Sequence, residues 1–312
     1  MAVVADTGYR ALTEAAGLVD RSERGKLALT GSEAKAFLHG QVTNDVEGLE
    51  PGRGCYAAFL THKGKMLGDL RVLDLGDELL LDTERVALQE LFNMIRRFKL
   101  GRDVELHKRT VELALFSLVG PQARRVAGAG ALGPDEHDNV PSVIAGVPVV
   151  LVATDVGVDV FVAAEAAATV RAAVDAPAVG EELAEVVRIE RGRPRYGIDL
   201  DDGVIPQEAG LNERAVSFTK GCYVGQETVA RLHYRGKPNR HLRGLRLSEP
   251  VATGEPLRLG EKPVGRIGSV AVSPANGPIA LALVRREASP GDTLAVGEGG
   301  VTAEVVALPF EG

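Results

Sequence analysis

Closely spaced turn signals restrict the fold of this chain more than any other feature. Between residues 55 and 81, apolar-rich runs are interrupted only at Lys63-Gly64 and Gly76-Asp77, which are two turn dipeptides. Runs joined by such short turns pair as antiparallel neighbours, because a parallel crossover needs a dozen residues or more. The pattern predicts hairpins here and argues against a doubly wound parallel sheet.

Helices are expected between these strands. Residues 26–29 read as a short strand, and Ser32 is the expected N-cap of a helix over residues 33–39. Apolar residues at helical spacing predict a second helix over residues 86–98, with Arg96, Arg97 and Lys99 at its C-terminal end, where cations suit the helix dipole. Hairpins mixed with helices favour the α+β class.

The rest of the chain continues this mixture and then changes character. We expect a strand over 111–119, a helix opening at Pro121, a hairpin of 143–153 with 156–163, and helices over 166–174 and 181–190. From Arg240 onward, short strands and frequent turns suggest a small antiparallel barrel or sandwich. The expected domains are 1–110, 111–239 and 240–312.

Bulk properties exclude several classes of protein. The 312 residues are 45% hydrophobic and 25% charged, which is enough to bury a sizeable core. A net charge of -7 argues against a molecule that coats nucleic acid or acidic lipid. No apolar run reaches the ~18–20 residues needed to cross a bilayer, and the first residues lack a secretory pattern. Two distant cysteines indicate a reducing compartment, so we expect a cytoplasmic protein without membrane contact.

Two motifs have simple structural explanations. Gly128, Gly130 and Gly133 spell G-x-G-x-x-G, but they follow an expected helix and precede Pro134, so the strand–turn–helix context of a dinucleotide site is missing. We interpret them as a flexible loop. The six histidines are scattered without metal-ligand spacing, and no metal site is expected.

The eight residues from Lys220 to Glu227, K-G-C-Y-V-G-Q-E, are the most specific segment of the chain. Two glycines bracket the thiol of Cys222 and the ring of Tyr223, and glycines let a backbone approach a ligand closely. A lysine two residues before a cysteine favours the reactive thiolate. Composition alone leaves an equal alternative, an inert cysteine in a Gly-rich turn.

This segment resembles the signature of the YgfZ-type folate-binding proteins. They are relatives of the glycine-cleavage T-protein and of the mitochondrial iron–sulfur assembly factor of the same superfamily. Three further stretches resemble the family in order and spacing: Gly25–Val46, Gly64–Val72 and Arg188–Asp199. The sequence is identified as a member of this superfamily on these four segments together.

The resemblance implies a three-lobed fold with a folate pocket and a C-terminal antiparallel β-barrel. It implies tetrahydrofolate or a one-carbon derivative as cofactor. By resemblance, Glu190 matches the glutamate that hydrogen-bonds the pterin, and Arg240 lies where an arginine contacts the carboxylate end of folate. The remaining expected cofactor residues are Tyr196, Tyr223, Gln226 and Glu227. The expected catalytic residues are Asp69, Lys220 and Cys222.

One departure from the T-protein pattern bears on activity. T-proteins carry two adjacent acids in a hairpin, whereas this chain has Gly68-Asp69 there. That difference and Cys222 favour the YgfZ branch. The branch implies an accessory protein for iron–sulfur enzymes, its clients, with effects on tRNA modification. The alternatives are a folate-dependent aminomethyltransferase or demethylase, and a binding module without chemistry.

A basic stretch follows the motif. Residues 228–248 contain six cations and no acid: Arg231, Arg235, Lys237, Arg240, Arg243 and Arg246. Such a stretch attracts a polyanion, either polyglutamylated folate or RNA; an equal alternative is a basic connecting loop balanced by acids elsewhere. With Tyr234 as its only aromatic residue and no RNA-binding motif, direct nucleic-acid binding is not expected.

Overall fold

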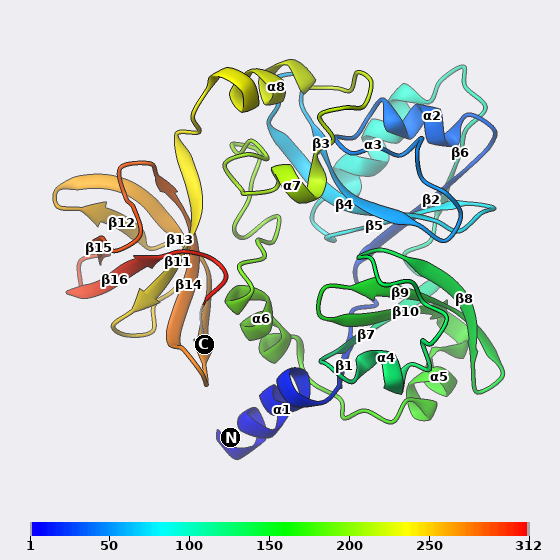
Figure 1. Cartoon of the computed structure of the whole chain (residues 1–312), viewed down its shortest axis with the longest axis horizontal. Coiled ribbons are helices and arrows are strands. Elements are labelled where there is room, and N and C mark those ends of the chain that lie inside the picture. The colour runs from blue at the N-terminus through cyan, green and yellow to red at the C-terminus, as the bar shows by residue number, and fades with distance from the viewer. Residues whose placement is uncertain (1, 311–312) are drawn as a thin grey trace. The chain divides into compact units, whose positions relative to one another are not determined.

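The computed structural model describes residues 2–310, and its elements are labelled in Figure 1. The chain divides into two compact units, each assembled from three separate segments. The first, here the N-unit, comprises the chain up to Thr61, Leu67–Ala184 and Arg214–Val224. The second, here the barrel unit, comprises His62–Met66, Glu185–Glu213 and the chain from Gly225 onward.

The first sheet of the N-unit contains the hairpins expected from the turn signals. Its order is β3-β4-β5-β2-β6. The strands are β2 (Gly25–Thr30), β3 (Gly54–Leu60), β4 (Met66–Asp74), β5 (Leu79–Thr83) and β6 (Glu105–Lys108). Gly64 and Gly76, with φ of 73° and 96°, lie in the two connecting turns. Only glycine adopts this backbone region at no steric cost, so the predicted turns are confirmed.

The second sheet of the N-unit has five strands, and three of them lie in the region predicted to form a two-stranded hairpin. Its order is β1-β7-β10-β9-β8. The strands are β1 (Gly17–Asp20), β7 (Leu113–Val119), β8 (Asn139–Ile144), β9 (Val147–Thr154) and β10 (Gly157–Ala163). The predicted hairpin is formed by β9 and β10, but its first strand does not reach back to Val143, because Ala145 and Gly146 both have positive φ, 50° and 79°, and form a tight turn there.

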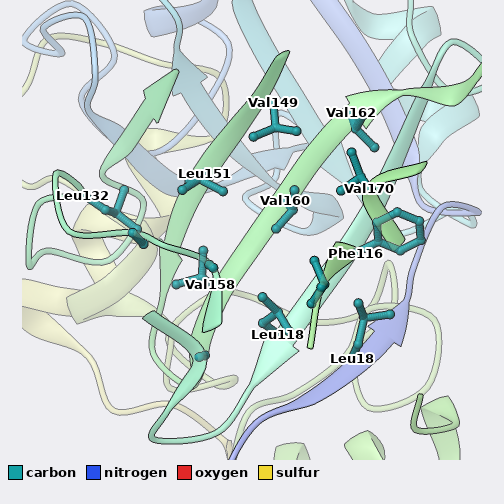
Figure 2. Close-up of a cluster of buried hydrophobic side chains, with 14 of the residues drawn as sticks. Leu18, Phe116, Leu118, Leu132, Val149, Leu151, Val158, Val160, Val162 and Val170 are labelled. Atoms are coloured by element: carbon teal, nitrogen blue, oxygen red, sulfur yellow. The ribbon is translucent and has the colours of Figure 1, made fainter. Parts of the chain in front are cut away.

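The second sheet buries both of its faces. One face packs against α4 (Ala123–Val126) and α5 (Ala167–Ala173), and Figure 2 shows its apolar side chains together with Val170 of α5. On the other face, Phe161 packs with Leu73 and Leu80 of the first sheet. Because strand residues alternate between faces, the same face of β10 also carries Asp159.

The remaining helices of the N-unit are short apart from two. They are α1 (Ala2–Glu14), α2 (Ala34–His39) and α3 (Leu88–Phe98), together with Arg214 and Ala215 of α7 (Asn212–Ala215). The expected N-cap is wrong: the helix begins at Ala34, and the Ser32 hydroxyl donates to Asp103 Oδ2 at 2.6 Å. Helix α6 (Glu181–Glu190) lies at its expected position, and α5 matches the helix expected over 166–174. The 3₁₀ turn η1 (Ala164–Ala166) before α5 was not predicted.

The barrel unit contains a closed six-stranded antiparallel barrel of order β11-β14-β13-β12-β15-β16. Its strands are β11 (Arg240–Leu247), β12 (Pro256–Leu259), β13 (Lys262–Ser273), β14 (Gly277–Arg285), β15 (Thr293–Val296) and β16 (Val301–Val306). Leu245, Leu257 and Leu281 are fully buried. The α+β class with a C-terminal antiparallel β-barrel is therefore confirmed.

Helix α8 (Gln226–Arg235) precedes the barrel in the same unit. It occupies residues 228–235 of the basic stretch and β11 occupies residues 240–247, so the interpretation of that stretch as a connecting loop is wrong for both parts. Its side chains are mostly polar and Val229 is its buried residue. A helix with so narrow an apolar stripe gives a weak periodic signal.

Candidate functional site

A buried carboxylate and a phenol lie side by side in the N-unit. Asp69 is on β4 and Tyr56 on the neighbouring strand β3. The Tyr56 hydroxyl donates a hydrogen bond to Asp69 Oδ2 at 2.7 Å, and Asp69 is only 6% exposed. The backbone around Asp69 is fixed as well, because the Thr83 hydroxyl donates to its carbonyl oxygen. The geometry holds one carboxylate in a defined orientation.

The arginines near this pair are committed to other carboxylates. Arg24 donates to both oxygens of Asp82, at 2.8 and 3.0 Å, and pairs with Glu84. Arg71 bridges Asp82 at 2.7 Å and Asp159 of the second sheet at 2.6 Å. Burial by itself would raise the pKa of Asp82, but Arg24 and Arg71 hold that pKa well below its usual range.

Asp69 has the opposite electrostatic character. Burial raises its pKa to about 6, even though the Tyr56 hydrogen bond and the charge of Arg24 lower it. A carboxyl group with a pKa near the working pH is suited to take up and release a proton. Buried carboxyls with raised pKa values also gather at functional sites. Asp69 thus has the properties expected of a general acid or base.

Two residues that the sequence did not single out support Tyr56. The guanidinium carbon of Arg214, on α7, lies 5.2 Å from the centre of the Tyr56 ring. The Asn44 amide donates to the carbonyl oxygens of Tyr56, at 2.8 Å, and of Arg214, at 3.2 Å. A cation over an aromatic face is attracted by the ring quadrupole. The chain around Arg214 is therefore tied to β3.

Lys220 has a structural role in the N-unit. Its ammonium group donates to three backbone carbonyls, those of His39, Val42 and Asn44, and lies 5.1 Å from the centre of the Tyr223 ring. Burial lowers the pKa of Lys220 to about 8. Three donated bonds use the full donor capacity of an ammonium group. Lys220 thus fastens the motif to the chain between α2 and β3.

The two cysteines differ in exposure. Cys222 is exposed and Cys55 is half-buried. Burial raises the pKa of the Cys55 thiol to about 12, and the thiol on which the Lys220 charge acts is that of Cys55. We expected Lys220 to act on Cys222; its three donated hydrogen bonds instead go to the backbone. Exposure is therefore what distinguishes Cys222 from Cys55.

In the barrel unit, two expected cofactor residues already have partners in the protein. Glu190, at the end of α6, accepts a hydrogen bond from the Ser273 hydroxyl, and its backbone oxygen accepts one from Phe310 N at 2.8 Å. Arg240 makes a two-pronged contact with Glu208, at 3.1 and 2.7 Å, and donates to Gly203 O at 2.7 Å. Both residues are half-buried and positioned by these contacts.

The other expected residues divide between the units. Asp69, Lys220, Cys222 and Tyr223 belong to the N-unit, and Tyr223 is only 7% exposed. The barrel unit holds the rest of the set: Glu190, Tyr196, Gln226, Glu227 and Arg240. Gln226 and Glu227 are the first residues of α8, whose N-cap is Gly225 with φ of 85°.

Two further observations concern residues 2–310 only. Within that range, no three His, Cys, Asp or Glu side chains are grouped so that they could hold a metal ion. None of the helices described there has the length and apolar character to cross a membrane.

Similarity to known families matches this architecture. Residues 2–220 match the family model of the GCVT N-terminal domain, and residues 240–311 match that of the glycine cleavage T-protein C-terminal barrel domain. The chain belongs to the glycine cleavage T-protein family. The aminomethyltransferase T of the glycine cleavage system from Bartonella henselae has the same fold, with a TM-score of 0.88 over 98% of this chain and 89% of that one, at 22% identity.

Relatives of this T-protein family member differ in what they are named for. An aminomethyltransferase of Rubrobacter xylanophilus is 31% identical over 97% of this chain and 85% of its own length. A putative chloroplastic transferase of Arabidopsis thaliana is 29% identical over 92% of this chain and 70% of its own. The tRNA-modifying protein YgfZ of Colwellia psychrerythraea is 28% identical over 78% of this chain and 77% of its own.

Position 68, next to Asp69, is a glycine in this T-protein family member, and the surrounding side chains leave no room there for an acidic side chain. A Cβ atom at Gly68 would lie 2.5 Å from Cζ of Phe59 and 2.7 Å from Cβ of Ala87. Adjacent strand residues point to opposite faces of a sheet, so a side chain at position 68 would point away from Asp69 and its partner Tyr56. The space on that side is filled by the Phe59 ring.

Proposed function

We propose that this protein binds tetrahydrofolate or a one-carbon derivative and belongs to the YgfZ branch of its family. In that role it acts as an accessory protein that helps assemble or repair iron–sulfur enzymes, and through them supports tRNA modification. The observation that carries the proposal is the segment Lys220–Glu227, which resembles the YgfZ signature and exposes the thiol of Cys222. Membership of the T-protein family and the YgfZ relative support it.

The donor and acceptor groups of the proposed residues suit a folate. A pterin presents an amine and a ring N–H side by side, and a carboxylate accepts from both. Glu190, the last residue of α6, is a carboxylate of this kind. Arg240 offers a guanidinium for the carboxylate end, and its contact with Glu208 holds the fork in place.

The chain's own contribution to chemistry centres on Asp69. When bound, tetrahydrofolate supplies a nitrogen that carries the one-carbon unit. Asp69, with its pKa raised to about 6 by burial, holds or releases a proton at its carboxylate near neutral pH. Tyr56 fixes the orientation of that carboxylate through the 2.7 Å hydrogen bond.

A second candidate function is an aminomethyltransferase or demethylase. The observation in its favour is the Tyr56–Asp69 pair, a buried and oriented carboxylate that an accessory role does not by itself require. The aminomethyltransferase relative from Rubrobacter xylanophilus, 31% identical, supports it as well. The two candidates share the folate and differ in whether the protein turns over a donor by itself.

Two experiments separate the candidates. Purified protein with tetrahydrofolate and methylamine-type donors should release little formaldehyde or ammonia, whereas robust turnover would favour the enzyme. In cells lacking the protein, wild type should restore iron–sulfur-dependent tRNA modification and Cys222→Ser should not. Cys55→Ala is the matched control, because the Cys55 thiol is half-buried and should be dispensable. Full complementation by Cys222→Ser would remove the observation on which the accessory role rests.

A further inference from the structure

A charged chain of contacts leads from the second sheet of the N-unit to the Tyr56–Asp69 pair. Arg214 lies over the Tyr56 ring, and its Nη2 is 2.5 Å from Oε1 of Glu136, in the loop before β8. Both side chains of this ion pair are partly buried, at 26% and 30% exposed. A pair of this kind is screened less than one on the surface.

The loop that carries Glu136 is held tightly. Arg53 pairs with Asp135 at 3.0 Å and also with Asp138, and Asp135 N donates to Asp138 Oδ2 at 3.0 Å. His137 N donates to Ala153 O at 2.8 Å, which fastens the loop to β9. The position of Glu136 is therefore determined by its neighbours on both sides.

His137 itself is in a conformation that needs this support. Its φ is 74°, a region that non-glycine residues rarely adopt, and it is only 6% exposed. Within the described residues, its buried Nδ1 has no hydrogen-bond partner. Burial lowers the pKa of His137 to about 3, so the ring stays neutral beside Glu136, whose Oε1 lies 3.7 Å from Nε2. Strained backbone persists where the surrounding structure enforces it, and it gathers at functional sites.

We propose that Arg214 is a positioning residue for the Tyr56–Asp69 pair, and that Glu136 holds Arg214 in place over the ring. The assignment of chemistry to Asp69 rests on the proposed function. The arrangement of Glu136, Arg214 and Tyr56 rests on the contacts described above. Through this arrangement, the loop that carries Glu136 in the second sheet affects the protonation of Asp69 in the first sheet.

The charged groups around the pair give the direction of the effect. Asp69 is faced by Tyr56 on β3, by Arg24 before β2, and by Asp82 and Glu84 on and after β5. Burial and the charge of Asp69 raise the pKa of Tyr56 well above its usual value, and the charges of Arg214 and Arg24 partly offset that rise, which makes the Tyr56 hydroxyl a better donor. Removal of the Arg214 charge weakens the hydrogen bond to the Asp69 carboxylate. A weaker hydrogen bond to the ionised carboxylate favours protonated Asp69.

The experiment is a pH titration of the Asp69 carboxyl carbon by ¹³C NMR, in protein without folate. The Asp69 resonance is assigned by its loss in Asp69→Asn. Arg214→Met keeps the apolar stem of the side chain, and in this variant the titration midpoint of Asp69 should rise by about half a pH unit or more. In Arg214→Lys the midpoint of Asp69 should lie between those of Arg214→Met and wild type. Arg109→Met is the matched control, because Arg109 pairs with Glu78 and Glu112 at 29% exposure and is expected to leave the midpoint unchanged.

Glu136 is tested by a double-mutant cycle. Glu136→Ala should change the Asp69 midpoint in wild type and have little further effect in Arg214→Met, because Glu136 acts through Arg214. Glu136→Gln keeps an acceptor for the guanidinium and should restore most of the wild-type value. An unchanged midpoint in folded Arg214→Met would overturn the proposal, as would an equal effect of Glu136→Ala in both backgrounds. The titration needs neither folate nor turnover, so a failure of the proposed function leaves its result interpretable.

Discussion

Two buried aspartates of the N-unit show how neighbours decide the charge of a carboxyl group. Asp82 is fully buried and receives two arginines, which keep it ionised. Asp69 is nearly as buried but receives a phenol, and its pKa is raised to about 6 by burial. The first arrangement stabilises the fold, whereas the second keeps a proton-transfer group available and lowers stability at neutral pH.

The pH dependence of stability measures this cost directly. Because the folded-state pKa of Asp69 lies above its usual value of 3.8, its contribution is most favourable below pH 3.8 and is lost as the pH rises through about 6. The Asp69→Asn variant does not lose stability in this way, because asparagine has no carboxyl group to ionise. The free energy of unfolding of the variant minus that of wild type should therefore rise between pH 4 and pH 7.5 by up to about 3 kcal/mol.

Urea unfolding of both proteins at several pH values checks this prediction. Asp82→Asn is the control, because the Asp82 contribution is lost only as the pH falls below its usual pKa of 3.8, so its difference from wild type should change little between pH 4 and pH 7.5. A difference between Asp69→Asn and wild type that does not change with pH would mean that Asp69 titrates normally.

At the scale of the strand, the alternation of β4 makes positions 68 and 69 different sites. Gly68→Asp should not supply a second acid to Asp69, because its side chain would meet Phe59 and Ala87 on the opposite face. We expect the substitution to lower the free energy of unfolding by about 1–3 kcal/mol or more, through overpacking and a buried charge.

Thermal or urea unfolding tests this expectation. Gly130→Asp is a matched control: Gly130 is exposed, and no described atom outside its immediate neighbours lies within 4 Å of an added Cβ. It should change stability by less than about 0.5 kcal/mol. Equal stabilities of the two variants would show that the Phe59 side of the strand has room for a carboxylate.

The strands β3, β4 and β5 could be predicted from the sequence, because the turns between them are formed by adjacent residues of typical turn composition, such as Lys63-Gly64. The pairing of Tyr56 with Asp69 was not predictable from composition, since it depends on which residues lie opposite each other on two strands. Arg214 was harder still, because its contact with the Tyr56 ring is made by a segment distant in sequence. The turn at Ala145 was missed because alanine rarely adopts positive φ.

For the molecule as a whole, the clearest expectation is stabilisation by folate. A ligand that binds only the folded state at about 100 times its Kd adds about 2.7 kcal/mol of apparent stability. The melting temperature should rise with tetrahydrofolate, and Glu190→Gln should weaken the rise because an amide accepts at one oxygen only. Glu287→Gln, an exposed barrel residue paired with Lys262, is the control. Absence of any shift in wild type at saturating tetrahydrofolate would refute folate binding.

The three-domain division at residues 110 and 239 stays a prediction. The described contacts group the chain into two units, and three segments of one alternate with three segments of the other. Each unit is therefore complete only when segments that are far apart in the sequence have come together. Arg214 and Lys220, for example, lie in the last segment of the N-unit, Arg214–Val224.

The alternation of segments determines when each unit can complete its folding during synthesis on the ribosome. The N-unit cannot be completed until residue 224 has emerged, although most of its chain has emerged long before. At about 5–20 residues per second, on the order of ten seconds separates the appearance of Asp69 from that of Arg214. During that interval the nascent chain presents Tyr56 without its cation and the carbonyls of His39, Val42 and Asn44 without the lysine that later joins them. The contacts around the Tyr56–Asp69 pair are therefore among the last of the N-unit to form as the chain is made.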